Sequence, residues 1–239
     1  MKPRLLDLFC GAGGAARGYQ MAGFHVTGID HRPQPRYAGD VFIHADALEY
    51  VAAYGQEYDV IHASPPCQAY SEATPRALRA RHPQLIAPLR TALEASECPY
   101  VIENVEGARW ELREPYMLCG TMFGLPLWRH RYFEVHPRSF ALLPCCHHTR
   151  RPVTLHIGSY TRKTIEPVLI SGSTRRTGER RRDYCVEEKR GAMQISWMML
   201  HELDQAIPPV YTEWIGQQLR RMLAAPPQQL RLPGEAPTR

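Results

Sequence analysis

Short apolar segments bounded by glycine, proline or acidic residues recur along the first hundred residues of the chain. The run LLDLF (5–9) leads into the glycine turn GAGG (11–14), and small and amphipathic residues at 15–23 predict a helix. A second apolar run, HVTGID (25–30), ends in an acid. This order predicts a strand, a glycine turn, a helix and a second strand, which together form a βαβ nucleotide-binding half.

Three further apolar segments continue the pattern. VFIHADA (41–47), YDVIHAS (58–64) and PYVIENV (99–105) are predicted to be strands, and an amphipathic stretch at 76–96 lies between the last two. Strands alternating with helices favour an α/β fold. We therefore predict a Rossmann-like architecture with a mixed, mainly parallel sheet and helices on both faces.

Composition fits this picture. The chain has 239 residues, of which 44% are hydrophobic and 22% charged, as in a globular protein with one α/β domain and a small insertion. The opening MKPRLLDLFCG carries an acid and runs into a glycine loop, so we expect neither a signal peptide nor a membrane span. Seven scattered cysteines are expected to be reduced thiols. We therefore expect the protein to stay in the cytoplasm. We also predict a monomer, because the chain has no repeats or heptads.

Several reactive side chains follow the predicted strands. Pro65 and Pro66 cannot continue a central strand, so the chain must turn there and display Cys67 at the carboxyl edge of the sheet, where open α/β sheets bind ligands. Glu103 ends another strand at the same edge and can hold a proton for a ring nitrogen. Asp30 lies about twenty residues beyond the glycine loop, a spacing that suits a ribose diol, and Asp46 suits an adenine amino group.

Four motifs in this order, DLFCGAGG, SPPCQ, ENV and RHRYFE, resemble those of DNA (cytosine-5) methyltransferases. The resemblance covers about residues 4–135, and the end, WMMLHELDQAIPPVYTEWIGQQL, looks like the C-terminal segment of short, phage-type members. It implies an S-adenosylmethionine-dependent methyltransferase fold with a small target-recognition insertion. It also implies that the protein transfers a methyl group from S-adenosylmethionine to carbon 5 of a flipped cytosine in double-stranded DNA and leaves S-adenosylhomocysteine. The reaction would require no metal and would take place in a bacterial or phage-infected cell.

The resemblance also assigns roles to residues. It makes Cys67 the covalent nucleophile, matches Glu103 to the glutamate that contacts the base, and matches Arg129 and Arg131 to the paired arginines beside it. We expect Arg131 to favour ionisation of the Cys67 thiol. The expected cofactor contacts are Phe9, Gly11, Gly13, Gly14, Asp30, Asp46 and Pro66, and the expected DNA contacts next to the nucleophile are Gln68 and Ser71.

Three positions depart from the family pattern. Leu127 stands where the family has a glutamine before the arginine pair, and Ser64-Pro65 replaces the usual glycine before Pro-Cys. The C-terminal Gly-Asn-Ser signature is absent. The first two substitutions look tolerable, whereas the third leaves the C-terminal cofactor contacts unassigned.

Charge is concentrated in one segment. Residues 150–190 hold eleven Lys and Arg against five Asp and Glu, although the whole chain carries only +5. A basic block of this kind is expected where a phosphate backbone is bound. We therefore divide the chain into a catalytic core (1–135), a basic target-recognition insertion (136–190) and a C-terminal segment returning to the core (191–223), and we expect residues 224–239 to be a disordered tail. The short insertion predicts a short recognition sequence, contacted by Arg175, Arg176, Arg180, Arg181 and Arg182.

Residues 145–148, Cys-Cys-His-His, are of types that bind zinc, but adjacent ligands are unlike the usual spaced pairs. Cys119, His136 or Cys185 would have to complete a site across the fold, and we assign no metal ligand.

Other functions stay open. They are a transfer-RNA-type cytosine-5 methyltransferase, an amino-group methyltransferase whose Ser-Pro-Pro motif continues with an aromatic residue instead of Cys67, and a catalytically silent DNA-binding protein. The biological purpose of such methylation also stays open, and protection against a restriction enzyme is one purpose among several.

Overall fold

The computed structural model describes residues 1–72, 74–138, 145–148, 153–157, 161–165 and 184–225. Within them a seven-stranded sheet has the order β3-β2-β1-β4-β5-β7-β6. The first five strands in the chain are parallel, and β7 runs antiparallel to both of its neighbours. The strands are β1 (Arg4–Leu8), β2 (His25–Asp30), β3 (Val41–His44), β4 (Val60–Ala63), β5 (Tyr100–Asn104), β6 (Tyr116–Leu118) and β7 (Arg131–His136).

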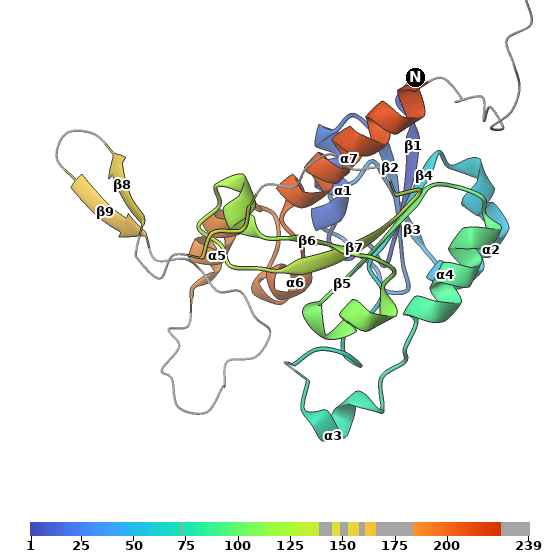
Figure 1. Ribbon diagram of the computed structural model, residues 1–239, viewed down its shortest axis with the longest axis horizontal. Coiled ribbons are helices and arrows are strands. Elements are labelled where there is room, and N and C mark those ends of the chain that lie inside the picture. The colour runs from blue at the N-terminus through green and yellow to red at the C-terminus, as the bar shows by residue number, and fades with distance from the viewer. Residues whose placement is uncertain (73, 139–144, 149–152, 158–160, 166–183, 226–239) are drawn as a thin grey trace, which may run out of the picture.

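Helices cover both faces of this sheet (Figure 1). Helices α1 (Gly14–Met21) and α7 (Pro209–Ala224) pack on one face, and α2 (Ala47–Tyr54) and α4 (Ile86–Ala95) pack on the other. The remaining elements are α3 (Arg76–Arg79), α5 (Val186–Met193), α6 (Leu200–Gln205), the 3-10 turns η1 (Gly55–Glu57), η2 (Glu106–Glu111) and η3 (Gly120–Phe123), and an antiparallel hairpin of β8 (Val153–Ile157) and β9 (Thr161–Ile165). The α/β, Rossmann-like fold predicted from the sequence is confirmed.

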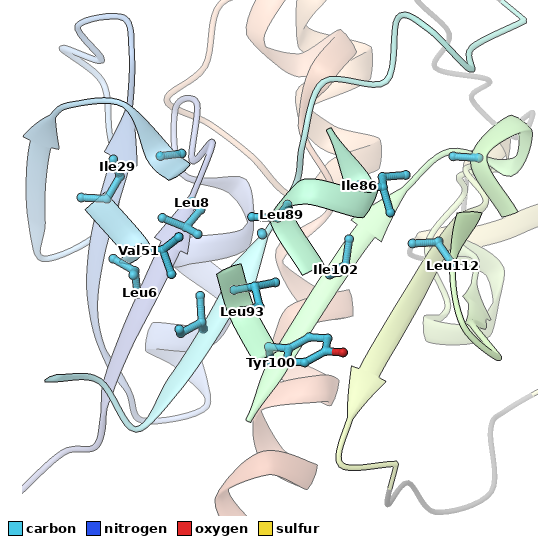
Figure 2. Close-up of a cluster of buried hydrophobic side chains, with 14 of the residues drawn as sticks. Leu6, Leu8, Ile29, Val51, Ile86, Leu89, Leu93, Tyr100, Ile102 and Leu112 are labelled. Carbon is cyan, nitrogen blue, oxygen red and sulfur yellow. The ribbon is translucent and has the colours of Figure 1, made fainter. Parts of the chain in front are cut away.

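The core has two layers because alternate residues of a strand point to opposite faces of a sheet. In β1, Leu6 and Leu8 face α2 and α4, whereas Leu5 faces α1 and α7. Figure 2 shows the first layer, in which Leu89 and Leu93 of α4 meet the sheet residues. A third cluster joins α5 and α6 to the segment that follows β6. Both faces of the central strands are therefore buried, as their continuous apolar runs predict.

One predicted boundary was wrong, and one amphipathic stretch is divided in two. The strand at 41–47 ends at His44, because Asp46 caps a helix, α2, that the sequence reading did not predict. The amphipathic stretch at 76–96 contains two helices, α3 and α4, and Pro83 lies between them. Proline lacks the amide donor that a continuous helix would need there.

Helix α7 brings the end of the chain back against α1. A Cβ atom placed on Gly18 of α1 would lie only 2.0 Å from the Pro209 carbonyl oxygen and 2.1 Å from Thr212 Oγ1. The Thr212 hydroxyl donates to the Ala15 carbonyl at 2.8 Å. Glycine at position 18 therefore allows the backbones of the two helices to approach closely.

Strand order reverses between β1 and β4, so the loops after these strands meet at the carboxyl edge of the sheet. The Ser64 amide after β4 donates to the Leu8 carbonyl of β1 at 3.1 Å. Such a switch point is where open α/β sheets bind ligands. Among the described helices, none combines the length and the apolar composition of a membrane span.

Candidate active site

The loop after β1 has a backbone shape that favours glycine. Gly11 and Gly13 have φ angles of +49° and +83°, and Phe9 has a φ of +58°. A Cβ on Gly11 would face open space, whereas one on Gly13 would lie 2.7 Å from the Ala38 amide nitrogen. On Gly14 it would lie 2.7 Å from the Ile207 carbonyl oxygen. The loop therefore packs on one side and leaves its backbone accessible at Gly11, as a close-fitting ligand requires.

Two acids lie at this end of the sheet. The buried carboxylate of Asp30 accepts hydrogen bonds from the Gly11 amide at 3.0 Å and the Arg32 amide at 2.9 Å, which ties β2 to the glycine loop. The exposed side chain of Asp46 caps α2 through one oxygen, Oδ1, which accepts from the amides of Leu48 and Glu49. An open glycine loop beside an acid that ends the second strand fits a nucleoside ligand.

The C-terminal segment supports the same loop. The indole nitrogen of Trp197 donates to the Ala12 carbonyl at 2.8 Å, and Arg36 binds both carboxylate oxygens of Glu202. No local sequence pattern reports these two contacts, because each joins residues more than 160 positions apart.

Cys67 lies on the turn that leaves β4. The Asn104 side chain donates to the Pro65 carbonyl at 3.0 Å, and the Cys67 carbonyl accepts from the amides of Tyr70 and Ser71. Asn104 is buried, and its side-chain oxygen Oδ1 accepts from the Val105 amide. The end of β5 therefore fixes the turn that presents Cys67, a positioning role that sequence reasoning did not assign to Asn104.

Glu103 lies next to Asn104 on β5 and is buried. Its Oε1 is 3.0 Å from Arg131 Nε in the ion pair between β5 and β7. Burial raises the pKa of Glu103 above its ordinary value, although Arg131, Arg129 and a hydrogen bond from Ser64 oppose the rise. A carboxyl group of this kind keeps its proton more readily than an exposed one, and that property suits a donor to a ring nitrogen.

Arg129 is buried beside this pair. Its Nη2 donates to the Asp204 carbonyl at 2.8 Å, and its own carbonyl accepts from the Tyr211 hydroxyl at 2.6 Å. Burial, reinforced by Arg131, lowers the pKa of Arg129 to about 9. Asp204 belongs to α6 and Tyr211 to α7, so the C-terminal part of the chain helps to place this arginine.

One expectation about Cys67 needs correction. The side chain is half-buried, not displayed, and burial raises the pKa of its thiol. Arg131 does lower the pKa of Cys67, as expected, but burial and the Glu103 charge outweigh it. The two arginines offset part of the burial effect without making the free thiol acidic.

A buried chain of hydrogen bonds ends at Glu103 and was not found from the sequence. The Tyr19 hydroxyl lies 3.0 Å from His62 Nδ1, and His62 Nε2 lies 2.9 Å from the Ser64 hydroxyl, which bonds Glu103. Burial lowers the pKa of His62 to about 3, so its ring is neutral at physiological pH. Ser64, where the family has glycine, thus connects Glu103 to α1. Leu127, the other tolerated departure, is fully buried in the third apolar cluster.

The remaining predicted residues are only partly placed. Pro66 and Ser71 are half-buried on the Cys67 turn, and Gln68 is exposed there. The predicted DNA contacts Arg175, Arg176, Arg180, Arg181 and Arg182 lie outside the described residues. The described part of the site therefore holds the candidate nucleophile, acid and arginines together, but not the proposed DNA-reading arginines.

Known proteins resemble part of this chain in sequence and most of it in fold. Residues 3–114 match the family described as C-5 cytosine-specific DNA methylase. The Type II methyltransferase M.XorII of Xanthomonas oryzae is 32% identical over 122 residues, which cover 44% of this chain and 29% of that protein. The chain thus matches less than a third of that relative's length.

Two solved structures show the same fold over 94% of this chain and 100% of theirs. They are the Dnmt2 methyltransferase of S. pombe, with a TM-score of 0.59 and 16% identity, and the Entamoeba histolytica methyltransferase EhMeth, with a TM-score of 0.57 and 12% identity. Residues 3–114, which include the Cys67 turn and Glu103, match the C-5 cytosine-specific DNA methylase family, and this match supports the resemblance seen in the sequence motifs.

Proposed function

We propose that this protein transfers a methyl group from S-adenosylmethionine to carbon 5 of a cytosine in double-stranded DNA, with Cys67 as the covalent nucleophile. The observation that carries the proposal is the ion pair of Glu103 and Arg131, 3.0 Å apart, whose charges both act on the Cys67 thiol. Cys67 on the turn after β4, Glu103 on β5 and Arg131 on β7 thereby form one group at the carboxyl edge of the sheet.

The chemistry explains why a thiol is needed. Carbon 5 of cytosine is too electron-poor to attack a methyl sulfonium, so a nucleophile must first add to carbon 6. The Cys67 sulfur would form that bond after losing its proton, and Arg131 and Arg129 would favour the thiolate. Once carbon 5 carries the methyl group, it loses its proton, and the bond between carbon 6 and the Cys67 sulfur breaks.

Glu103 would act at the opposite side of the ring. As the sulfur adds, negative charge develops at ring nitrogen 3, and a protonated Glu103 would donate to it. The raised pKa of Glu103 supports this role, and Ser64 holds its carboxyl group in place. Arg131 would then stabilise the glutamate that remains.

The cofactor supplies an electrophilic methyl group. Phe9, Gly11, Gly13 and Gly14 would hold its amino-acid part through the backbone, and Asp30 would accept from the ribose. Asp46 would contact the adenine through the oxygen that does not cap α2, with Pro66 beside it. No metal enters this reaction.

A cytosine within a duplex would have to be flipped to reach Cys67, at a cost of a few kcal/mol. Gln68 and Ser71, on the Cys67 turn, would contact the DNA there, and the basic excess of residues 150–190 would offset the cost through phosphate contacts. We infer a monomer acting in the cytoplasm of a bacterial or phage-infected cell. The name of the Xanthomonas relative, a type II methyltransferase, supports a place in restriction and modification.

The proposal is tested by methyl transfer from radiolabelled S-adenosylmethionine to duplex DNA and, in parallel, to transfer RNA. We expect 5-methylcytosine in DNA, loss of activity in Cys67→Ala, and a rate about 10²–10³-fold lower in Glu103→Gln. Label in RNA alone would establish the RNA enzyme instead. Activity that survives Cys67→Ala would point to amino-group methylation, and cofactor binding without transfer to any nucleic acid would favour a silent binder.

A further inference from the structure

Four side chains outside the proposed catalytic group converge on one point. They are Cys119, His130, Cys146 and His148, and their ligand atoms all lie within 4.8 Å of one another. Cys119 precedes η3, His130 precedes β7, and the other two belong to the short described segment 145–148. The cluster thus joins the core to a segment that the sequence reading assigned to the insertion.

Four of the six separations match the edges of a tetrahedron around one metal ion. With Zn–S and Zn–N bonds of about 2.3 Å and 2.05 Å, two nitrogens should lie about 3.3 Å apart, and a nitrogen and a sulfur about 3.5 Å apart. The His130 and His148 Nε2 atoms are 3.2 Å apart. His148 Nε2 lies 3.2 Å from both sulfurs, and His130 Nε2 lies 3.6 Å from Cys146 Sγ.

Hydrogen bonds alone do not account for this arrangement. His148 Nε2 has three neighbours at 3.2 Å, namely the sulfurs of Cys119 and Cys146 and the nitrogen of His130. One ring nitrogen carries either one proton or one lone pair, so it cannot bond well to all three. A shared cation at the centre would satisfy the four groups at once.

We propose that Cys119, His130, Cys146 and His148 bind one structural zinc ion. Two sulfur and two imidazole ligands are a common zinc set, and four protein ligands leave no open position for catalysis. On binding, both cysteines lose their protons to water, and the two thiolates neutralise the charge of Zn²⁺.

The surroundings support a thiolate site. The Thr121 hydroxyl donates to Cys119 Sγ at 3.4 Å and lies 3.6 Å from Cys146 Sγ, as an outer-layer partner of a ligand should. The Trp128 ring lies 4.9 Å from the His148 ring, nearly parallel to it, and covers one side.

The zinc would have a defined mechanical effect. His130 lies between Arg129 and Arg131, so a metal bond at His130 would restrain the backbone that carries both arginines to the proposed catalytic group. The bonds to Cys146 and His148 would attach the segment 145–148 to the same point. This inference stands whether the substrate is DNA or RNA, because it rests on the ligand set alone.

The test is the metal content of the purified full chain after passage over a chelating resin, measured by mass spectrometry of the elements. We expect about one zinc per chain in the wild type and background zinc in Cys146→Ser and His148→Asn. These two ligands lie outside the sheet, so the variants should still fold, as circular dichroism will check. Cys145→Ser and His147→Gln are matched controls, because both residues are exposed neighbours outside the cluster, and they should retain the zinc.

Cobalt gives a second readout. Replacing the metal with Co²⁺ should produce the visible bands of a tetrahedral site and sulfur-to-cobalt charge transfer from two thiolates, which Cys146→Ser should reduce. Wild-type protein without bound metal that also gives no such bands would overturn the proposal. An intact mass two hydrogens too low, from a Cys119–Cys146 disulfide, would overturn it as well.

Discussion

Replacing Gly18 with alanine tests how closely α1 must pack on α7. In an ordinary helix this change stabilises the fold by about 0.8–1.0 kcal/mol. Here the added Cβ would lie 2.0 Å from the Pro209 carbonyl oxygen and 2.1 Å from Thr212 Oγ1, whereas ordinary contact begins at 3.4 Å. The helices would have to separate by about 1.4 Å, the difference between those values.

The cost follows from two effects. Overpacking a close contact costs about 1–3 kcal/mol, and a buried Thr212 hydroxyl that loses its acceptors costs about 1–3 kcal/mol more. After the helix gain is subtracted, the variant should be destabilised by about 1–5 kcal/mol. Each kcal/mol lowers the melting temperature of a chain this long by about 2–4 °C.

Thermal unfolding of Gly18→Ala and Gly191→Ala measures the effect. Gly191 lies in α5, and a Cβ there would meet nothing within 4 Å, so Gly191→Ala should be neutral or stabilised by up to about 1 kcal/mol. Gly18→Ala should also bind S-adenosylhomocysteine more weakly, because α1 begins at the glycine loop. If both variants gain stability to the same extent, the packing argument fails.

Three further predictions concern the catalytic group. Asn104→Ala removes the hydrogen bond to the Pro65 carbonyl, so the rate of single-turnover methyl transfer should fall by about 10²-fold. The affinity for S-adenosylhomocysteine, measured by calorimetry, should not change. A wild-type rate in this variant would show that the turn keeps its shape without the Asn104 side chain. The rate of Cys67 alkylation, followed by peptide mapping, should keep rising above about pH 9, because burial raises the pKa of the thiol. The rate should fall in Arg131→Ala, because Arg131 lowers that pKa. Faster alkylation in this variant would contradict the role assigned to Arg131. The pKa of Glu103 is raised in the folded protein, so its contribution to stability is full below about pH 4 and is lost as pH rises through that pKa. The melting temperature of Glu103→Gln should therefore rise relative to that of wild type from about pH 4 to pH 8. A difference in melting temperature that does not change with pH would refute this prediction.

The sequence predicted the central strands well because their signal is local. Continuous apolar runs ending in a glycine turn, an acid or two prolines marked β1, β2, β4 and β5, and those ends placed Cys67 and Glu103 on one edge. Helix α2 was missed because its cap, Asp46, had been given to the preceding strand.

The contacts that were missed join distant positions. The Asp204 carbonyl and the Tyr211 hydroxyl that hold Arg129 lie more than seventy residues from it, and no local pattern reports such pairs. The Cys-His cluster is similar, because only the fold brings Cys119 and His130 to Cys146 and His148. Sequence reasoning had considered Cys119 as a partner but not His130, which lay inside the arginine motif.

The most direct test of the central claim is covalent trapping. The full chain would be incubated with S-adenosylmethionine and duplex DNA that carries 5-fluorocytosine, and denaturing gels would be run on wild type and Cys67→Ala. Fluorine at carbon 5 blocks the loss that releases the enzyme. We predict a denaturation-resistant adduct that needs both the cofactor and Cys67, and sequencing of the trapped DNA would give the recognition site. If wild type binds the cofactor yet forms no adduct, or if Cys67→Ala forms one, the account of Cys67 as nucleophile on DNA cytosine is wrong.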